Sequence, residues 1–374
     1  MMIRKISFLI FVLVMESPCY SQDGHVLYGD HPHGDMSIYI DANGFPYPDY
    51  FISNDFLKSC GSTLLNWYTA NPGEFVNVAE LYDLHFDKFS EEYVDSLNNT
   101  IYKSLVNRVN ESNVKREPVT AMVHGYRKAF TSFNHDRCSP AEYDGLREIL
   151  IKNGHRSAVY LEVYWDGMYG CCFSASAKKN RTLFEMFLEA QENAIPTGQQ
   201  LRKILNGLET DTLHLISHSL GAKVLTHCLW DPLNIDIPTP EQSCVNICLI
   251  APAISAEEVL RDHFNQRNTS FDSFWNDNYR VMIIYNEKDF VLRKKDFAIG
   301  LFGPGPYKYG DTSLGCNKRK SAENCRLYIS KTTAKSSFQL FDFTETGKCH
   351  HLYCYCRNPL FRQVVNAMNG VSNY

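Results

Sequence analysis

The chain has 374 residues, of which 44% are hydrophobic and 13% aromatic; this is enough apolar material for a large core and excludes a disordered chain. Its 37 Lys and Arg residues against 42 Asp and Glu residues give a formal net charge of -5, and no block of basic residues stands out. Neither nucleic acid nor an anionic membrane surface is therefore expected as a partner.

Residues 1–21 have the layout of a secretory signal peptide. Arg4 and Lys5 form a short positive region, and the apolar run over 6–15 is shorter than the roughly 20 residues that span a bilayer. Cleavage after Ser21 predicts a secreted or periplasmic protein without a stable membrane anchor. The alternative is an uncleaved anchor, which the lack of a following stop-transfer pattern disfavours.

The cysteines are typical of an exported protein. The chain has 13 of them, and removal of Cys19 with the signal peptide leaves an even number, which predicts several disulfides. Cys228 and Cys248 lie in apolar runs and are expected to be buried thiols. A zinc site over residues 349–356 is the alternative, but no matching ligand pair stands elsewhere. The cysteines in loop-like sequence are the candidates for disulfides: Cys171, Cys172, Cys316, Cys325, Cys349, Cys354 and Cys356.

Two regions follow the signal peptide. Residues 22–117 form an N-terminal accessory region with one short strand near 37–40 and a helix over 89–114, where apolar residues recur every four positions. Residues 118–374 form a larger domain in which short apolar strands alternate with helical segments. This alternation predicts an α/β fold with a mostly parallel sheet and helices on both faces.

The expected strands of this domain are short and apolar, as in strands that are buried on both faces. A helical stretch before residue 212 is expected to break at Pro196 and to resume over 199–208. Further helices are expected over 222–230 and 359–368. The strands are predicted at residues 119–123, 158–164, 213–217, 245–251, 280–285 and 338–343.

Ser219 lies in a tight turn between the strand at 213–217 and the helix at 222–230. A nucleophile in such a turn needs small residues two before and two after it, and Ser217 and Gly221 meet this demand. The start of the helix would stabilise negative charge beside the serine. The alternative is an ordinary serine that caps the helix.

An attacking serine also needs backbone N–H groups for the oxyanion. One donor should be the amide of Leu220, the residue after the nucleophile. The other should be the amide of Gly125 or Tyr126, in the loop that follows the first strand of the domain. His124 in the same loop is interpreted as a structural histidine.

The acid and the base should follow later strands. Asp289 stands four residues after the strand at 280–285, with Glu287 and Asp296 as competitors on solvated faces. His350 and His351 stand in the loop after the last strand. The order Ser, Asp, His along the chain is the order of α/β-hydrolases.

These features resemble the α/β-hydrolase superfamily across roughly residues 118–370, and in detail a bacterial esterase/lipase-like branch of it. The resemblance rests on the His124-Gly125-Tyr126 loop, the Ser-His-Ser-Leu-Gly turn at 217–221 and a terminal His-x-Tyr motif. That branch places its histidine two residues before the tyrosine, which implies that the base is His351, before Tyr353, and not His350. The resemblance implies a triad of Ser219, Asp289 and His351 that needs no cofactor.

The expected function is a serine hydrolase that cleaves a small-molecule or lipid carboxylic ester through an acyl-enzyme, with a thioester or an amide as the alternative substrate. A catalytically silent binding protein of the same fold is the alternative function. A second motif, His31-Pro32-His33-Gly34-Asp35, resembles the start of a metallo-hydrolase site. Because Met36 stands where a further histidine is needed, we interpret it as a polar N-terminal segment and expect no metal.

Overall fold

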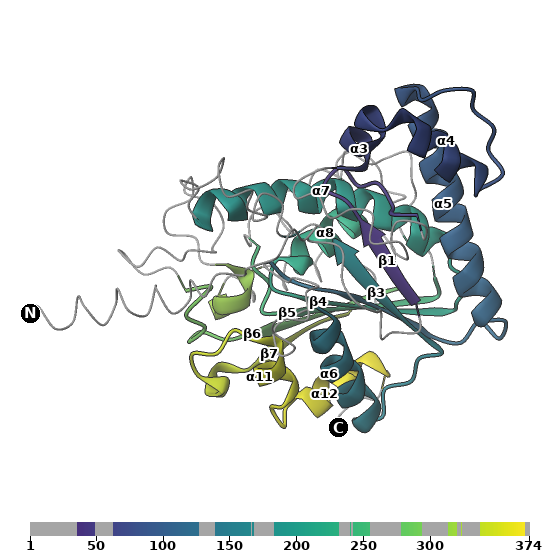
Figure 1. Cartoon of the computed structure of the whole chain (residues 1–374). Coiled ribbons are helices and arrows are strands. Elements are labelled where there is room, and N and C mark those ends of the chain that lie inside the picture. Colours follow the sequence, from purple (N-terminus) through teal and green to yellow (C-terminus); the bar gives the residue numbers. More distant parts are fainter. Residues whose placement is uncertain are drawn as a thin grey trace, which may run out of the picture.

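A computed structural model describes residues 36–48, 63–126, 139–165, 183–231, 242–254, 278–293, 313–319 and 337–370, with Gly167, Pro240 and Glu323. The predicted signal peptide, the motif at 31–35 and Asp296 lie outside these residues. The described chain folds around a sheet of seven strands in the order β1-β3-β2-β4-β5-β6-β7 (Figure 1). Every neighbouring pair of strands is parallel.

All seven described strands begin and end within one residue of the bounds predicted from the sequence. Their side chains are buried almost throughout β2 to β6, as expected for a parallel sheet that is covered on both faces. The strands are β1 (Met36–Ile40), β2 (Val119–Val123), β3 (Val159–Trp165), β4 (Thr212–His218), β5 (Cys244–Ile250), β6 (Tyr279–Tyr285) and β7 (Ser337–Asp342).

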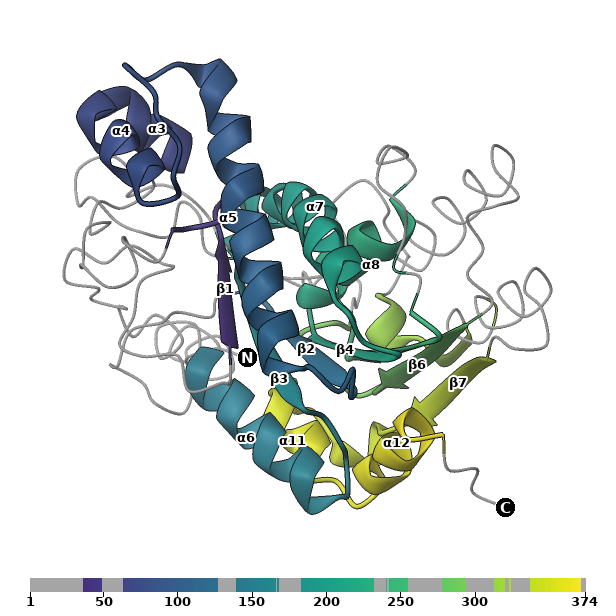
Figure 2. The same cartoon turned by 90° about the vertical axis from the view of Figure 1, so that its right-hand side faces the viewer.

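Helices cover both faces of the sheet, as predicted. Figure 2 shows α5, α7 and α8 on one face and α6, α11 and α12 on the other. Within the described residues, no helix is long and apolar enough to cross a membrane. The helices are α3 (Leu64–Ala70), α4 (Pro72–Glu80), α5 (Glu91–Ser112), α6 (Ser139–Lys152), α7 (Leu183–Gly207), α8 (Gly221–Trp230), α11 (Leu352–Cys356) and α12 (Phe361–Met368), with short 3-10 turns η4 (Leu314–Cys316) and η5 (Thr344–Thr346).

The described part of the N-terminal region is joined to the main sheet. β1, which we expected in an accessory region, pairs with β3 from Met36 beside Leu161 to Ile40 beside Trp165. The long helix α5 has a buried face that includes Leu97 and packs against α7. Residues 36–117 therefore contribute an edge strand and a covering helix to the same core as the strands that follow.

The expected break at Pro196 is wrong, because α7 runs through this proline without interruption. Proline removes one backbone donor from a helix, so something else must hold the segment. Thr197 donates its hydroxyl to the Asn193 carbonyl at 2.8 Å. Gly198 lies so close to α8 that a β-carbon there would stand 2.4 Å from the Val224 carbonyl oxygen. Packing against α8 therefore outweighs the local preference of the proline.

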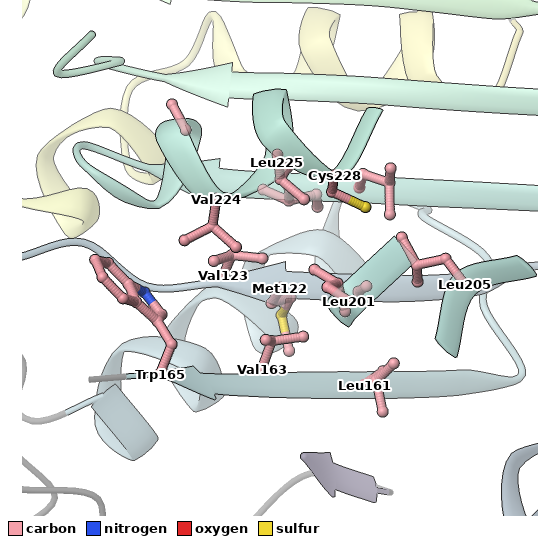
Figure 3. Packing of buried hydrophobic residues seen from close by; sticks show 14 of the residues in the cluster. Met122, Val123, Leu161, Val163, Trp165, Leu201, Leu205, Val224, Leu225 and Cys228 are labelled. Atoms are coloured by element: carbon pink, nitrogen blue, oxygen red, sulfur yellow. The ribbon is translucent and has the colours of Figure 1, made fainter. Parts of the chain in front are cut away.

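The core lies between the sheet and these helices. Figure 3 shows side chains of β2 and β3, among them Val123 and Leu161, against side chains of α7 and α8, among them Leu201 and Val224. All four are nearly or fully buried. Burial of each aliphatic side chain contributes about 1.5–3 kcal/mol, which fixes α8 and the turn that precedes it over the end of the sheet.

The strand order places a switch point between β2 and β4. From β2 the chain crosses through α6 to β3 on one side, and from β4 it crosses through α8 to β5 on the other side. In open parallel sheets, ligands bind beyond the carboxyl ends of the strands at such a point. Ser219 follows β4 and His124 follows β2, so both stand at this position.

Candidate active site

Ser219 occupies a strained turn between β4 and α8. Its φ of 53° lies in the left-handed region, which costs energy for any residue with a β-carbon. Backbone hydrogen bonds hold it there: the Ser219 amide donates to the Ile250 carbonyl, and the Ala253 amide donates to the Ser219 carbonyl, both at 3.0 Å. A β-carbon on Gly221 would lie 2.4 Å from the His124 carbonyl oxygen, so only glycine fits two residues after the serine.

The loop after β2 lies directly beside the serine. A β-carbon on Gly125 would come within 2.9 Å of the Ser219 β-carbon. His124 is buried and braces this loop: its Nδ1 donates to the Gly125 carbonyl at 2.8 Å, and its Nε2 accepts the Trp165 amide at 3.2 Å. His124 is thus a structural histidine, as we expected from the sequence.

A continuous line of hydrogen bonds joins Ser219 to Asp289 through His350. The Ser219 Oγ lies 2.9 Å from the Nε2 of His350, and the Nδ1 of His350 lies 2.7 Å from the Oδ2 of Asp289. Because the carboxylate accepts the Nδ1 proton, Nε2 of the neutral ring is left to accept the serine proton. The three side chains come from the ends of β4, β6 and β7.

The prediction of His351 at this position is wrong, and the adjacent His350 takes its place. The backbone is extended at His351, and neighbouring side chains of an extended segment point to opposite sides. With His350 turned toward Ser219, His351 is exposed and stacks on the Tyr353 ring, with 5.7 Å between the ring centroids. The His-x-Tyr spacing therefore selected a surface pair, because Tyr355 and not Tyr353 contacts the site.

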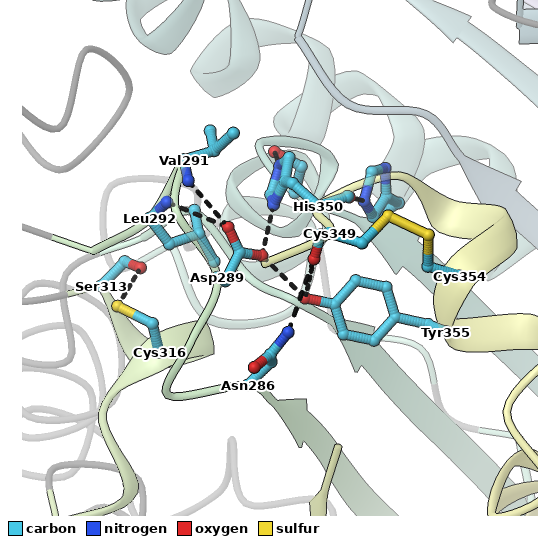
Figure 4. A network of polar contacts seen from close by, with 12 residues as sticks. Asn286, Asp289, Val291, Leu292, Ser313, Cys316, Cys349, His350, Cys354 and Tyr355 are labelled. Atoms are coloured by element: carbon cyan, nitrogen blue, oxygen red, sulfur yellow. Dashed lines mark hydrogen bonds and ion pairs between the residues drawn. A yellow bond between two sulfur atoms is a disulfide. The ribbon is translucent and has the colours of Figure 1, made fainter. Parts of the chain in front are cut away.

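Asp289 is fully buried and receives four donors (Figure 4). Its Oδ1 accepts the amides of Val291 at 3.0 Å and Leu292 at 3.2 Å. Its Oδ2 accepts the Tyr355 hydroxyl at 2.7 Å as well as the His350 ring. These bonds offset the cost of a charged group without water. Glu287, the competing acid, is exposed as expected.

Three contacts hold the loop of His350. A disulfide joins Cys349 to Cys354 across it. His218 donates from Nε2 to the His350 carbonyl at 2.8 Å, and Asn286 donates to the Gly347 carbonyl at the same distance. Cys349 and Cys354 were both predicted as disulfide candidates, whereas the other two contacts were missed because they depend on the tertiary fold.

Cys316 and Cys356 were candidates for disulfides, but both are free thiols in the structure. Cys228 and Cys248 are buried in the core, as predicted, and Cys356 is buried without joining the disulfide of its neighbours. Burial raises the pKa of the Cys316 thiol to about 11, so it stays neutral near Asp289. Within the described ranges, no group of three or more His, Cys, Asp or Glu side chains could hold a metal ion. The remaining candidates for disulfides lie outside the described residues.

The parallel sheet with its switch point, the strained serine turn and the Ser, Asp, His order define the architecture. The chain has the α/β-hydrolase fold. Neither a protein-family model nor a curated protein sequence matches it. Several solved structures match it at low sequence identity.

Three of these solved structures are bacterial proteins. An uncharacterized protein from Bacillus cereus matches with a TM-score of 0.35 and 10% identity over 82% of this chain and 86% of its own. Esterase B from Lactobacillus rhamnosis matches with a TM-score of 0.30 and 9% identity over 68% of this chain and 78% of its own. Carboxylesterase CesB from Bacillus subtilis matches with a TM-score of 0.29 and 12% identity over 68% of this chain and 85% of its own.

Proposed function

We propose that the protein is a serine hydrolase that cleaves a carboxylic ester through an acyl-enzyme on Ser219. The observation that carries the proposal is the unbroken line from Ser219 through His350 to the buried Asp289. A serine held in a left-handed turn, with an imidazole nitrogen at its oxygen, is the arrangement that nucleophilic catalysis needs.

In this mechanism the Oγ of Ser219 attacks the ester carbonyl while the Nε2 of His350 takes its proton. Asp289 orients the ring and stabilises the positive charge that forms on it. His350 then gives the proton to the leaving alcohol, and a water molecule attacks the acyl-enzyme by the same route in reverse. The cycle returns Ser219 with its proton and releases a carboxylic acid.

The oxyanion would be held by backbone amides at the mouth of the turn. The Leu220 amide is at the N-terminus of α8, where the first N–H groups have no partner within the helix. His124 bonds the Gly125 carbonyl, so this carbonyl points toward the His124 ring. In a trans peptide the N–H group points in the direction opposite to the carbonyl, so the Tyr126 N–H points away from the His124 ring. This favours Tyr126 over Gly125 as the second donor.

The test is active-site labelling of the folded protein with a fluorophosphonate probe. The wild type should incorporate one probe on Ser219 and hydrolyse short acyl nitrophenyl esters. Ser219→Ala should abolish both, whereas Ser217→Ala, which removes a buried hydroxyl two residues earlier, should keep both. A folded wild type that neither labels nor turns over any short ester would overturn the proposal.

A further inference from the structure

We propose that Tyr355 is a positioning residue of the site, whose hydroxyl holds Asp289 in the orientation that aims His350 at Ser219. This inference rests on the proposed serine-hydrolase function and adds a residue beyond the nucleophile, the base and the acid. Tyr355 lies on α11, in the segment that follows the His350 loop (Figure 4).

The decisive contact is the shared oxygen of the carboxylate. The Tyr355 hydroxyl and the Nδ1 of His350 both stand 2.7 Å from Oδ2 of Asp289. The amides of Val291 and Leu292 hold only Oδ1 of Asp289. With these two bonds alone, the carboxylate could still rotate and move Oδ2. The hydroxyl supplies the remaining constraint, because it fixes where Oδ2 lies and hence the direction of the bond to His350.

Tyr355 is held as a donor by its surroundings. Its side chain is fully buried, and its ring lies 6.1 Å from the Phe343 ring, centroid to centroid. Burial and then the adjacent Asp289 carboxylate raise the pKa of Tyr355 far above its usual value. The hydroxyl therefore keeps its proton at neutral pH, and that proton points to the carboxylate.

The same hydroxyl also lies close to the loop that carries the base. It lies 3.4 Å from the Cys349 carbonyl, directly before His350. The disulfide between Cys349 and Cys354 closes this loop onto α11, one residue before Tyr355. The tyrosine thus ties Asp289 and the His350 loop to one short helix, whose inward face it forms with Leu352 and Cys356.

Loss of the hydroxyl should affect the transition state more than substrate binding. Asp289 would keep three donors, so the fold should persist, but the imidazole would be less well aligned when it takes the serine proton. The carboxylate would also share its charge with one donor fewer and stabilise a charged His350 more strongly. Among the described residues, the titratable side chains that contact His350 are Asp289 and His218 from the end of β4, with 5.1 Å between the two imidazole centroids.

The experiment compares Tyr355→Phe with Tyr102→Phe in the full chain. Tyr102 is a matched control, because its buried hydroxyl donates to the Gly44 carbonyl at 2.6 Å, away from the site. We expect Tyr355→Phe to lower kcat on a nitrophenyl ester by about 10- to 100-fold with KM nearly unchanged. The acidic limb of its kcat/KM profile should move to higher pH. Tyr102→Phe should change neither.

A second measurement is a double-mutant cycle with Asp289→Asn. If Tyr355 acts through Asp289, then Tyr355→Phe should lower kcat much less in the Asp289→Asn protein than in the wild type. An equal loss in both backgrounds, or a Tyr355→Phe enzyme with the kcat and pH profile of Tyr102→Phe, would overturn the inference and leave the serine-hydrolase proposal standing. A folded wild type without any hydrolysis would remove both proposals.

Discussion

The two ends of the same parallel sheet carry histidines in opposite settings. At the carboxyl ends of the strands, His350 bridges a carboxylate and a strained serine, and its side chain keeps 14% of its surface exposed. Nearer the amino ends, His155 and His214 form a buried pair with 4.5 Å between their ring centroids. β4 connects the two settings, because it carries His214 at its third residue and leads into Ser219.

The histidines at the two ends of the sheet differ in their hydrogen-bond partners. His155 contacts the Thr120 hydroxyl at 2.9 Å, and His214 contacts the Asn246 amide at 3.2 Å. Neither contact offers a carboxylate to stabilise a charged ring, so burial keeps both rings neutral. His350 has a carboxylate on one nitrogen and a nucleophile on the other. His350 is therefore the candidate base because it has both an acid that orients it and a serine oxygen to deprotonate.

The largest expected effect at the amino end is acid sensitivity. Burial lowers the pKa of His155 from 6.5 to about 4 and that of His214 to about 3. A histidine whose pKa is lower in the folded state than in the unfolded state contributes stability that is complete above pH 6.5. This stability is lost as the pH falls toward the pKa of the folded state, and for His155 the loss in free energy of unfolding is about 3 kcal/mol. His214→Gln should therefore move the acid unfolding midpoint to lower pH, as followed by circular dichroism.

The control for this prediction is His85→Gln, because His85 is exposed. It should unfold in acid as the wild type does. At neutral pH, His214→Gln should keep its fluorophosphonate labelling, since the site lies at the other end of β4. An unchanged acid midpoint in His214→Gln would contradict the assignment of the buried pair as the acid-sensitive element.

A smaller effect is expected from the disulfide at the carboxyl end. Replacing both Cys349 and Cys354 by Ser removes a closed loop that stabilises the fold by about 2 kcal/mol in the chain-entropy account. Because that loop carries His350, the rate of probe labelling should fall together with the melting temperature. A reductant should slow labelling of the wild type but not of the double variant. Equal labelling rates for the two proteins would contradict the role given to the loop.

The smallest expected effect concerns the strain at Ser219. Glycine adopts a positive φ without the steric cost of a β-carbon, so Ser219→Gly should be more stable than Ser219→Ala by about 1 kcal/mol. Urea denaturation of the two inactive variants measures this difference directly. A Ser219→Gly protein no more stable than Ser219→Ala would show that the turn stores no such strain.

The strands could be predicted well from the sequence, whereas the histidine and the tyrosine that contact Asp289 could not. Runs such as Val281–Ile284 are apolar throughout, and in a parallel sheet burial on both faces leaves little freedom in where they end. Pro196 was misjudged because local propensity does not include the contact of Gly198 with α8. The role of Tyr355 had no local signal at all, because it depends on a carboxylate 66 residues away.

The choice between His350 and His351 tests the account most directly. The two histidines are adjacent, yet only His350 contacts both Ser219 and Asp289. Hydrolysis of a short nitrophenyl ester should fall by roughly 10⁴-fold or more in His350→Ala, because members of a triad act as a unit, and should stay within about threefold of wild type in the exposed His351→Ala. Full activity in His350→Ala, or its loss only in His351→Ala, would contradict the account.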